Sequence, residues 1–75
     1  MQFDRELDAS GLNCPLPILR TKKALADMPS GHVLKVIATD PGAVRDFALF
    51  AQQTGNEFLG QNEANGAFVF YIKRR

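Results

Sequence analysis

The sequence has very little of the chemistry that small proteins use for cross-links or metal sites. Its 75 residues include one cysteine, one histidine and no tryptophan. A lone cysteine cannot form an intramolecular disulfide, and one cysteine with one histidine is too small a set for a four-ligand zinc site. We therefore expect no disulfide, no metal and no cofactor. If Cys14 has a chemical role, it acts as a single thiol facing another molecule.

The sequence also lacks a long apolar run and a large excess of either charge. No stretch approaches the roughly 18 apolar residues that a membrane span needs. Residues 1–6 mix both signs of charge and lack the apolar core of a signal peptide. Nine basic and eight acidic residues leave a formal charge of +1, too little to hold a nucleic-acid backbone by charge alone. We expect a cytoplasmic protein that contacts neither membrane nor nucleic acid directly.

The composition is otherwise that of a small folded domain. Hydrophobic residues make up 45% of the chain and charged residues 23%, which excludes a disordered chain. No internal repeat or linker is present. We expect one domain over residues 1–75, with a thin core because a chain of this size buries only about 60% of the surface that its unfolded form exposes.

The first part of the chain predicts a strand followed by a helix. Residues 3–9 alternate with period two, with Phe3 and Leu7 on the apolar side, which is typical of a half-buried strand. A turn over residues 10–13 follows. Pro15 suits the first position of a helix, where its missing N–H costs nothing, and the helix is expected to run to about Met28.

A second strand and helix follow. Residues 33–38 are rich in β-branched residues and almost wholly apolar, as expected of an inner strand. Asp40 and Pro41 predict the cap and first position of a helix that ends at Gly55. Its apolar stripe at helical spacing comprises Val44, Phe47, Ala48 and Ala51.

The chain closes with a hairpin, in which Asn65-Gly66 joins a strand near 58–64 to a strand at 67–73. The element order is therefore β-α-β-α-β-β. Two right-handed crossovers put both helices on one face of the sheet. The predicted fold is an α/β two-layer sandwich with a four-stranded mixed sheet, whose other face, including Lys35, is open to solvent.

Cys14 carries the strongest chemical signal. It precedes Pro15 and is interpreted as the N-cap of the first helix, where the helix dipole lowers the pKa of a thiol. Pro17 has no N–H to donate to the sulfur, and the two prolines fix the conformation of the first turn that carries it. The thiol is therefore expected to be available for reaction. The alternative is a small buried hydrophobe, the usual fate of a lone cysteine, but a junction between prolines is a poor place for a core residue.

The segment Cys14-Pro15-Leu16-Pro17 resembles the CPxP signature of the TusA/SirA sulfur-carrier family, and the resemblance extends along nearly the whole chain. It implies a strand order of 1-2-4-3 and a sulfane sulfur carried as a persulfide on Cys14, in surroundings shaped by Pro15 and Pro17. The implied partners are a cysteine desulfurase or rhodanese-type donor and an acceptor in tRNA thiolation, cofactor maturation or sulfur oxidation. Many members have an acidic residue in place of Leu16, and some have a second cysteine in place of Ala51. Both departures bear on the choice of partner.

One side of the first helix is a predicted docking face. Ile18, Thr21 and Leu25 should face the sheet. The opposite side presents Leu16, Leu19, Arg20 and Lys23. We expect these residues to bind an acidic partner, although single exposed leucines are also ordinary on protein surfaces. A carrier that must expose its cysteine is best served by a monomer.

Other candidate residues have plainer interpretations. His32 is a general-base candidate for Cys14, although a solvated loop histidine is the commoner case. Residues 73–75 are expected to form a solvated tail. Two functions compete with the sulfur carrier: a nucleic-acid-binding regulator using the open sheet face, and an interaction module without chemistry.

Overall fold

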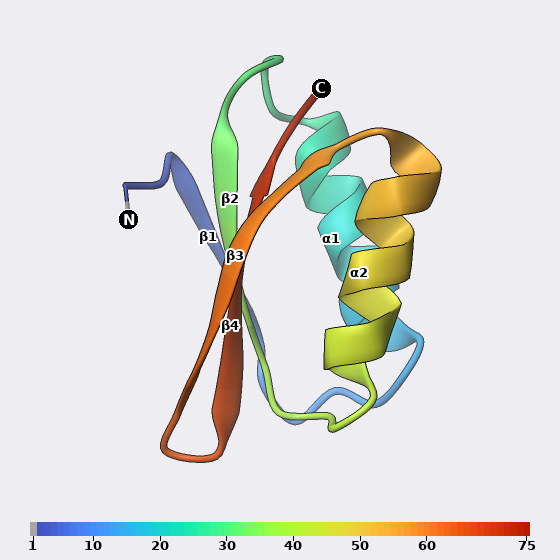
Figure 1. Ribbon diagram of the computed structural model, residues 1–75, viewed down its shortest axis with the longest axis vertical. Coiled ribbons are helices and arrows are strands. Elements are labelled where there is room, and N and C mark those ends of the chain that lie inside the picture. Colours follow the sequence, from blue (N-terminus) through green and yellow to red (C-terminus); the bar gives the residue numbers. More distant parts are fainter. Residues whose placement is uncertain (1) are drawn as a thin grey trace.

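Two helices cover one face of a four-stranded sheet in the computed structural model, which describes residues 2–75 (Figure 1). The elements, in chain order, are β1 (Arg5–Ala9), α1 (Leu16–Ala26), β2 (Val33–Ala38), α2 (Ala43–Thr54), β3 (Glu57–Ala64) and β4 (Ala67–Lys73). The strand order is β1-β2-β4-β3, with β1 parallel to β2 and the remaining pairs antiparallel. The predicted two-layer sandwich and the 1-2-4-3 order are confirmed.

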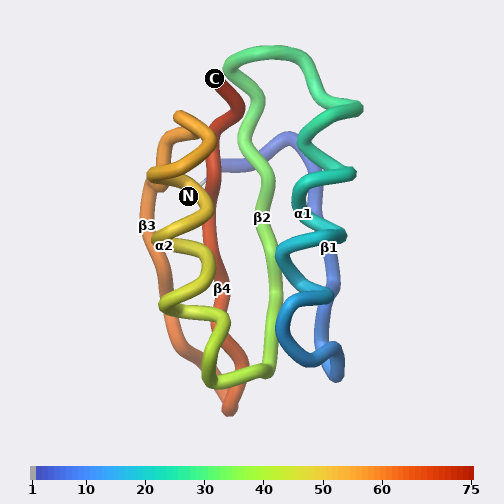
Figure 2. Tube along the Cα trace, turned by 90° about the vertical axis from the view of Figure 1, so that its right-hand side faces the viewer, coloured from blue at the N-terminus to red at the C-terminus, as the bar shows by residue number. Residues whose placement is uncertain are grey.

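The core lies between the sheet and the helices. Along β2, Leu34, Val36 and Ala38 are fully buried. On α2, Phe47 is also fully buried, and its ring stacks on that of Phe70 with centroids 4.5 Å apart. Figure 2 shows α1 lying near β1 and β2, and α2 near β4 and β3, with the two helices running in the same direction.

The buried stripe of α2 is rotated from the predicted one. Ala48 is exposed, contrary to the prediction, whereas Phe50 is 6% exposed and belongs to the core. The reason is that α2 packs against α1 as well as against the sheet, so the buried arc turns toward the neighbouring helix. Phe50 lies on that side, and Ala48 lies on the side away from it.

The prediction for Phe3 is wrong. β1 begins only at Arg5, because Asp4 is held to Val33 by two hydrogen bonds, one from its own N–H and one accepted by its carboxylate, both 2.8 Å long. Ahead of this anchor the alternation fails, and the Phe3 ring lies 6.4 Å from that of Tyr71 and 5.1 Å from Lys35 Nζ. The sheet face predicted to be open is therefore partly covered.

The C-terminal end of the second helix and the turn of the hairpin were predicted correctly. Gly55 caps α2 with φ +78°, and Asn65 and Gly66 both have positive φ, as a type I′ turn requires. α1 ends at Ala26 rather than at Met28. Neither of the helices described in residues 2–75 has the length and apolar character needed to cross a membrane.

The predicted tail is not free. Arg74 donates its N–H to the His32 carbonyl at 2.9 Å and accepts from Gly31 N–H at 2.8 Å. The N–H of Arg75 donates to Asn56 Oδ1 at 3.0 Å. Hydrogen bonds from their backbone groups therefore hold both arginines in place, so they do not form a free tail, although Arg75 remains exposed as predicted.

Candidate functional site

Cys14 is exposed and lies in the loop between β1 and α1, at the edge where the parallel strands β1 and β2 end (Figure 1). It is not the N-cap. Pro15 is the cap residue, and the Leu16 N–H donates to the Asn13 carbonyl at 2.8 Å, which closes a turn before the helix begins. The Cys14–Pro15 peptide bond is cis. The thiol therefore stands one residue outside the predicted position, while Pro17 is buried in the first turn of α1.

Two residues after β2 hold the cysteine loop. The Cys14 N–H donates to Asp40 Oδ2 at 2.9 Å, across 26 positions of sequence. The other oxygen, Oδ1, accepts from Gly42 N–H at 3.3 Å, and Thr39 Oγ1 accepts from Gly11 N–H at 2.8 Å. Asp40 was predicted as the cap of the second helix. That cap is Gly42, and Asp40 instead ties the start of α2 to the backbone of the reactive residue.

Asp46 lies in the first turn of α2 and lines the same groove as Cys14. Hydrogen bonding to its carboxylate raises the pKa of the Cys14 thiol above the ordinary cysteine value. Desolvation and the negative charges of Asp46 and Asp40 act in the same direction. The predicted lowering of the pKa by the helix dipole is therefore wrong. Sequence reasoning gave Asp46 no chemical role, although its place in the first turn of a helix that starts at the same edge of the sheet could have indicated one.

A groove of about 330 Å³ runs from Cys14 between the two helices. From the α1 side it is lined by Cys14, Pro15, Ile18 and Lys22. From α2 it is lined by Asp46, Leu49, Phe50, Gln53 and Thr54. The sulfur therefore opens onto a partly apolar surface with a carboxylate beside it.

The residues of the predicted docking face lie on another side of α1. Leu16 is 44% exposed and Leu19 is 52% exposed, so the prediction that they face water is confirmed. Arg20 and Lys23 are also exposed and line a different hollow, together with Asp27. None of these four residues lines the groove at Cys14.

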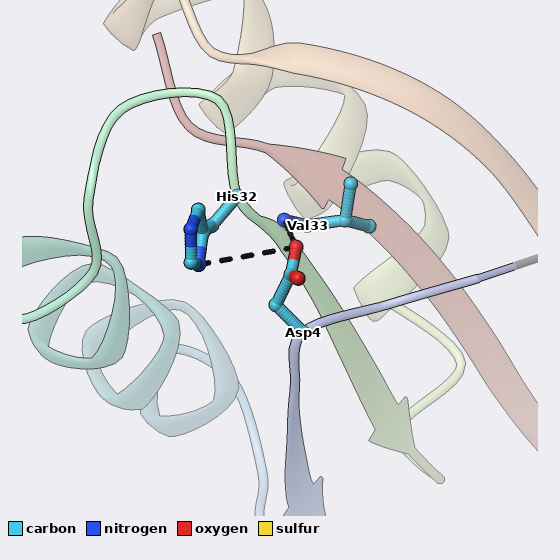
Figure 3. A network of polar contacts seen from close by, with 3 residues as sticks. All are labelled: Asp4, His32 and Val33. Atoms are coloured by element: carbon cyan, nitrogen blue, oxygen red, sulfur yellow. Dashed lines mark hydrogen bonds and ion pairs between the residues drawn. The ribbon is translucent and has the colours of Figure 1, made fainter.

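His32 lies at the opposite end of the sheet, just before β2 begins. Its Nδ1 is 4.0 Å from Asp4 Oδ2, and the same oxygen accepts the Val33 N–H (Figure 3). The histidine therefore cannot serve Cys14 as a general base. Within residues 2–75, no cluster of three or more histidine, cysteine or acidic side chains is arranged to hold a metal ion.

This arrangement defines a class of protein: a small α/β domain that presents one thiol to other molecules from the edge of its sheet. The model of the family described as "Sulfurtransferase TusA" matches residues 5–74. The chain belongs to this family.

Relatives match this chain over nearly its full length and theirs. The chain is 67% identical to the "Sulfur carrier protein TusA" of Allochromatium vinosum, over 96% of this chain and 95% of that protein. It is 44% identical to the protein of the same name from Pseudomonas entomophila, over 96% and 90%. The crystal structure of a SirA-like protein from Desulfitobacterium hafniense superposes with a TM-score of 0.83 at 28% identity, covering 93% of this chain and 96% of that one.

Proposed function

We propose that this protein is a sulfur carrier that holds a sulfane sulfur as a persulfide on Sγ of Cys14. The observation that carries the proposal is the single exposed thiol in the segment Cys14-Pro15-Leu16-Pro17, within a chain so similar to proteins named sulfur carriers. The donor is a cysteine desulfurase or rhodanese-type protein, the acceptor is a second protein, and the exchange takes place in the cytoplasm with the carrier as a monomer.

The transfer is an exchange between sulfur atoms. The Cys14 thiolate attacks the outer sulfur of the donor's persulfide, a new S–S bond forms, and the donor's own S–S bond breaks. The donor leaves as a thiolate and takes up a proton, so the exchange involves no net oxidation. Because the chain has one cysteine, no internal thiol can expel the bound sulfur as a disulfide. The persulfide therefore persists until an acceptor thiolate arrives.

The surroundings suit a carrier that stays inactive between partners. Thiolate is the nucleophile in sulfur exchange, and Asp46 favours the protonated thiol by raising the pKa of Cys14. Asp40 holds the backbone of the cysteine in place. In this proposal the free carrier is slow to react with stray oxidants, and a partner that brings positive charge to Asp46 activates it.

The docking face remains part of the proposal. Two exposed leucines beside two cations, close to the reactive residue, form a surface suited to the body of an acidic partner. Leu16 and Leu19 supply apolar area, and Arg20 and Lys23 supply the charge.

An intact-mass measurement tests the carrier function. After incubation with a cysteine desulfurase and cysteine in buffer without reductant, the mass should rise by about 32 Da, one sulfur atom. Cys14→Ser should show no rise. Equal loading of the serine variant would contradict the proposal. A chain that neither loads sulfur nor needs its cysteine in cells would instead be an interaction module or a nucleic-acid-binding regulator.

A further inference from the structure

A second hollow continues the groove beside Cys14 toward the far ends of the helices. It measures about 390 Å³ and shares Lys22, Phe50 and Thr54 with the groove. Its other walls are Leu25, Ala26, Asn56, Arg74 and Arg75. Since α1 and α2 run in the same direction (Figure 2), the two hollows follow one another along the helix pair. We call them together the inter-helix channel, with Cys14 at one end.

The far end of the channel carries unbalanced positive charge. Lys22, Arg74 and Arg75 line it and no carboxylate does. The ion pairs found among residues 2–75 are His32–Asp4 and Lys35–Glu6, and both lie elsewhere. The carboxyl ends of two helices offer only about half a negative charge each. A terminal carboxylate at Arg75 would offset one further positive charge, and the far end of the channel would still have an excess of positive charge.

The backbone that carries these arginine side chains is held in place by hydrogen bonds. Arg74 and Arg75 are held by the hydrogen bonds to His32, Gly31 and Asn56 described above. The side chain of Arg75 lies against Gly55, so close that a Cβ added to the glycine would be 3.4 Å from its Cδ. An anion bound here therefore loses less affinity to the ordering of side chains than it would on a mobile tail.

We propose that the inter-helix channel receives an extended acidic segment of a sulfur-exchanging partner, and that this segment carries the partner's reactive cysteine. The partner's cysteine lies next to Cys14. An Asp or Glu further along the partner's segment binds the cations at the far end of the channel. Between them, Ile18, Leu49 and Phe50 contact an apolar side chain. The inference rests on the sulfur-carrier function and adds the chemistry of the partner.

The length of the channel sets the spacing in the partner. α1 has 11 residues, which corresponds to about 16 Å. An extended peptide rises about 3.3 Å per residue, so the acidic residue lies about five positions from the partner's cysteine. A protein segment fits better than a nucleic acid, because the middle of the channel is apolar and the formal net charge of the chain is only +1.

The test is the binding of a labelled peptide, Ser-Gly-Leu-Gly-Ser-Glu-Glu, followed by fluorescence anisotropy with the full chain. Serine replaces the reactive cysteine, so binding is measured apart from sulfur chemistry. Lys22→Gln with Arg74→Gln should weaken binding by about tenfold, as expected for the loss of two exposed ion pairs. Arg5→Gln with Lys73→Gln removes the same charge outside the channel and should bind like the parent. Circular dichroism checks that both variants fold.

The matched peptide ending in Gln-Gln should bind about as weakly as the channel variant binds the acidic peptide. Equal binding of the two peptides, or an equal loss in both double variants, would overturn the proposal. Tighter binding of a single-stranded oligouridylate than of the acidic peptide, lost in the same channel variant, would assign the channel to nucleic acid and also overturn it. Loading of the parent from inorganic polysulfide is measured separately, so a failure of the carrier function is distinguished from a failure of the channel.

Discussion

At the scale of single residues, the thiol is governed by its carboxylate neighbours and not by the helix below it. The effect of a helix dipole falls off within the first turn, and Cys14 lies outside that turn because Pro15 is the cap. Hydrogen bonding to Asp46 raises the pKa of the Cys14 thiol, and the negative charge of Asp40 acts in the same direction. A full charge within hydrogen-bonding reach outweighs the partial charge of a helix end.

Asp46→Asn should therefore lower the pKa of Cys14. The variant removes the negative charge that favours the protonated thiol, so the thiolate forms at lower pH. Each unit of lowering increases the thiolate tenfold at a pH below the pKa and reduces its nucleophilicity about threefold, for a net gain of about threefold in rate. Thiolate absorbance against pH, together with the rate of loading from polysulfide, measures both effects. Glu63→Gln, far along β3, is the control, and an unchanged titration in Asp46→Asn would refute the role of this carboxylate.

Asp40→Ala should loosen the cysteine loop. It leaves the N–H groups of Cys14 and Gly42 without their acceptor, which should cost about 1–2 kcal/mol of the free energy of unfolding. Asp40→Asn keeps an acceptor oxygen and should cost less. Urea unfolding measures stability, and loading from polysulfide reports the position of the sulfur. If the Asp40→Ala and Asp40→Asn variants had equal free energies of unfolding and equal rates of loading from polysulfide, Asp40 would not hold the cysteine loop.

At the scale of elements, the two sides of α1 differ as its sequence predicted. Thr21 and Leu25 face the core, while Leu16 and Leu19 face water. An amphipathic helix shows this pattern in its sequence. Both helices pack on the sheet and on each other, and on α2 the buried arc includes Phe50 and leaves Ala48 exposed, so its stripe was predicted incorrectly at these two positions. Periodicity gives the approximate direction of the buried side, and its limits have to be seen in the structure.

Leu19→Glu combined with Arg20→Glu tests the docking face. Both side chains are exposed, so the fold should remain and the Cys14 thiol should titrate as before. Loading from the physiological donor should slow by about tenfold or more, because apolar contact is lost and an acidic partner is repelled. Loading from polysulfide should be unaffected. Equal slowing with both donors would indicate damage at the thiol, and no slowing with either would place the docking face elsewhere.

At the scale of the whole molecule, a thin core carries the stability. The Phe47 and Phe70 rings stack at its centre, and both residues are fully buried. Domains of this size have few such contacts, and total stabilities of natural domains are only about 5–15 kcal/mol. The site at the edge of the sheet therefore depends on this aromatic packing, since Phe47 directly follows Asp46 in α2.

Phe47→Ala should reduce the free energy of unfolding by about 3–5 kcal/mol, since it removes a buried ring and leaves a cavity. Leu49→Ala, on the same helix but 43% exposed, should change it by about 0.5 kcal/mol or less. Denaturant unfolding followed by circular dichroism compares the two variants. A similar loss in both would mean that the core does not centre on Phe47.

What the sequence determined by itself is local: the element order, the Asn65-Gly66 turn, the Gly55 cap and the exposed Cys14 follow from spacing, turn chemistry and one motif. Tertiary structure decided what depends on residues far apart in the chain. It brought Asp40 to the Cys14 backbone, placed Asp46 against the thiol, folded Phe3 over Tyr71, and fixed Arg74 and Arg75 at the end of the inter-helix channel. The physical reason is the distance along the chain over which each kind of interaction acts. Propensities and caps act within one or two turns, whereas a pKa or a charged channel depends on every group that the fold brings within a few ångströms.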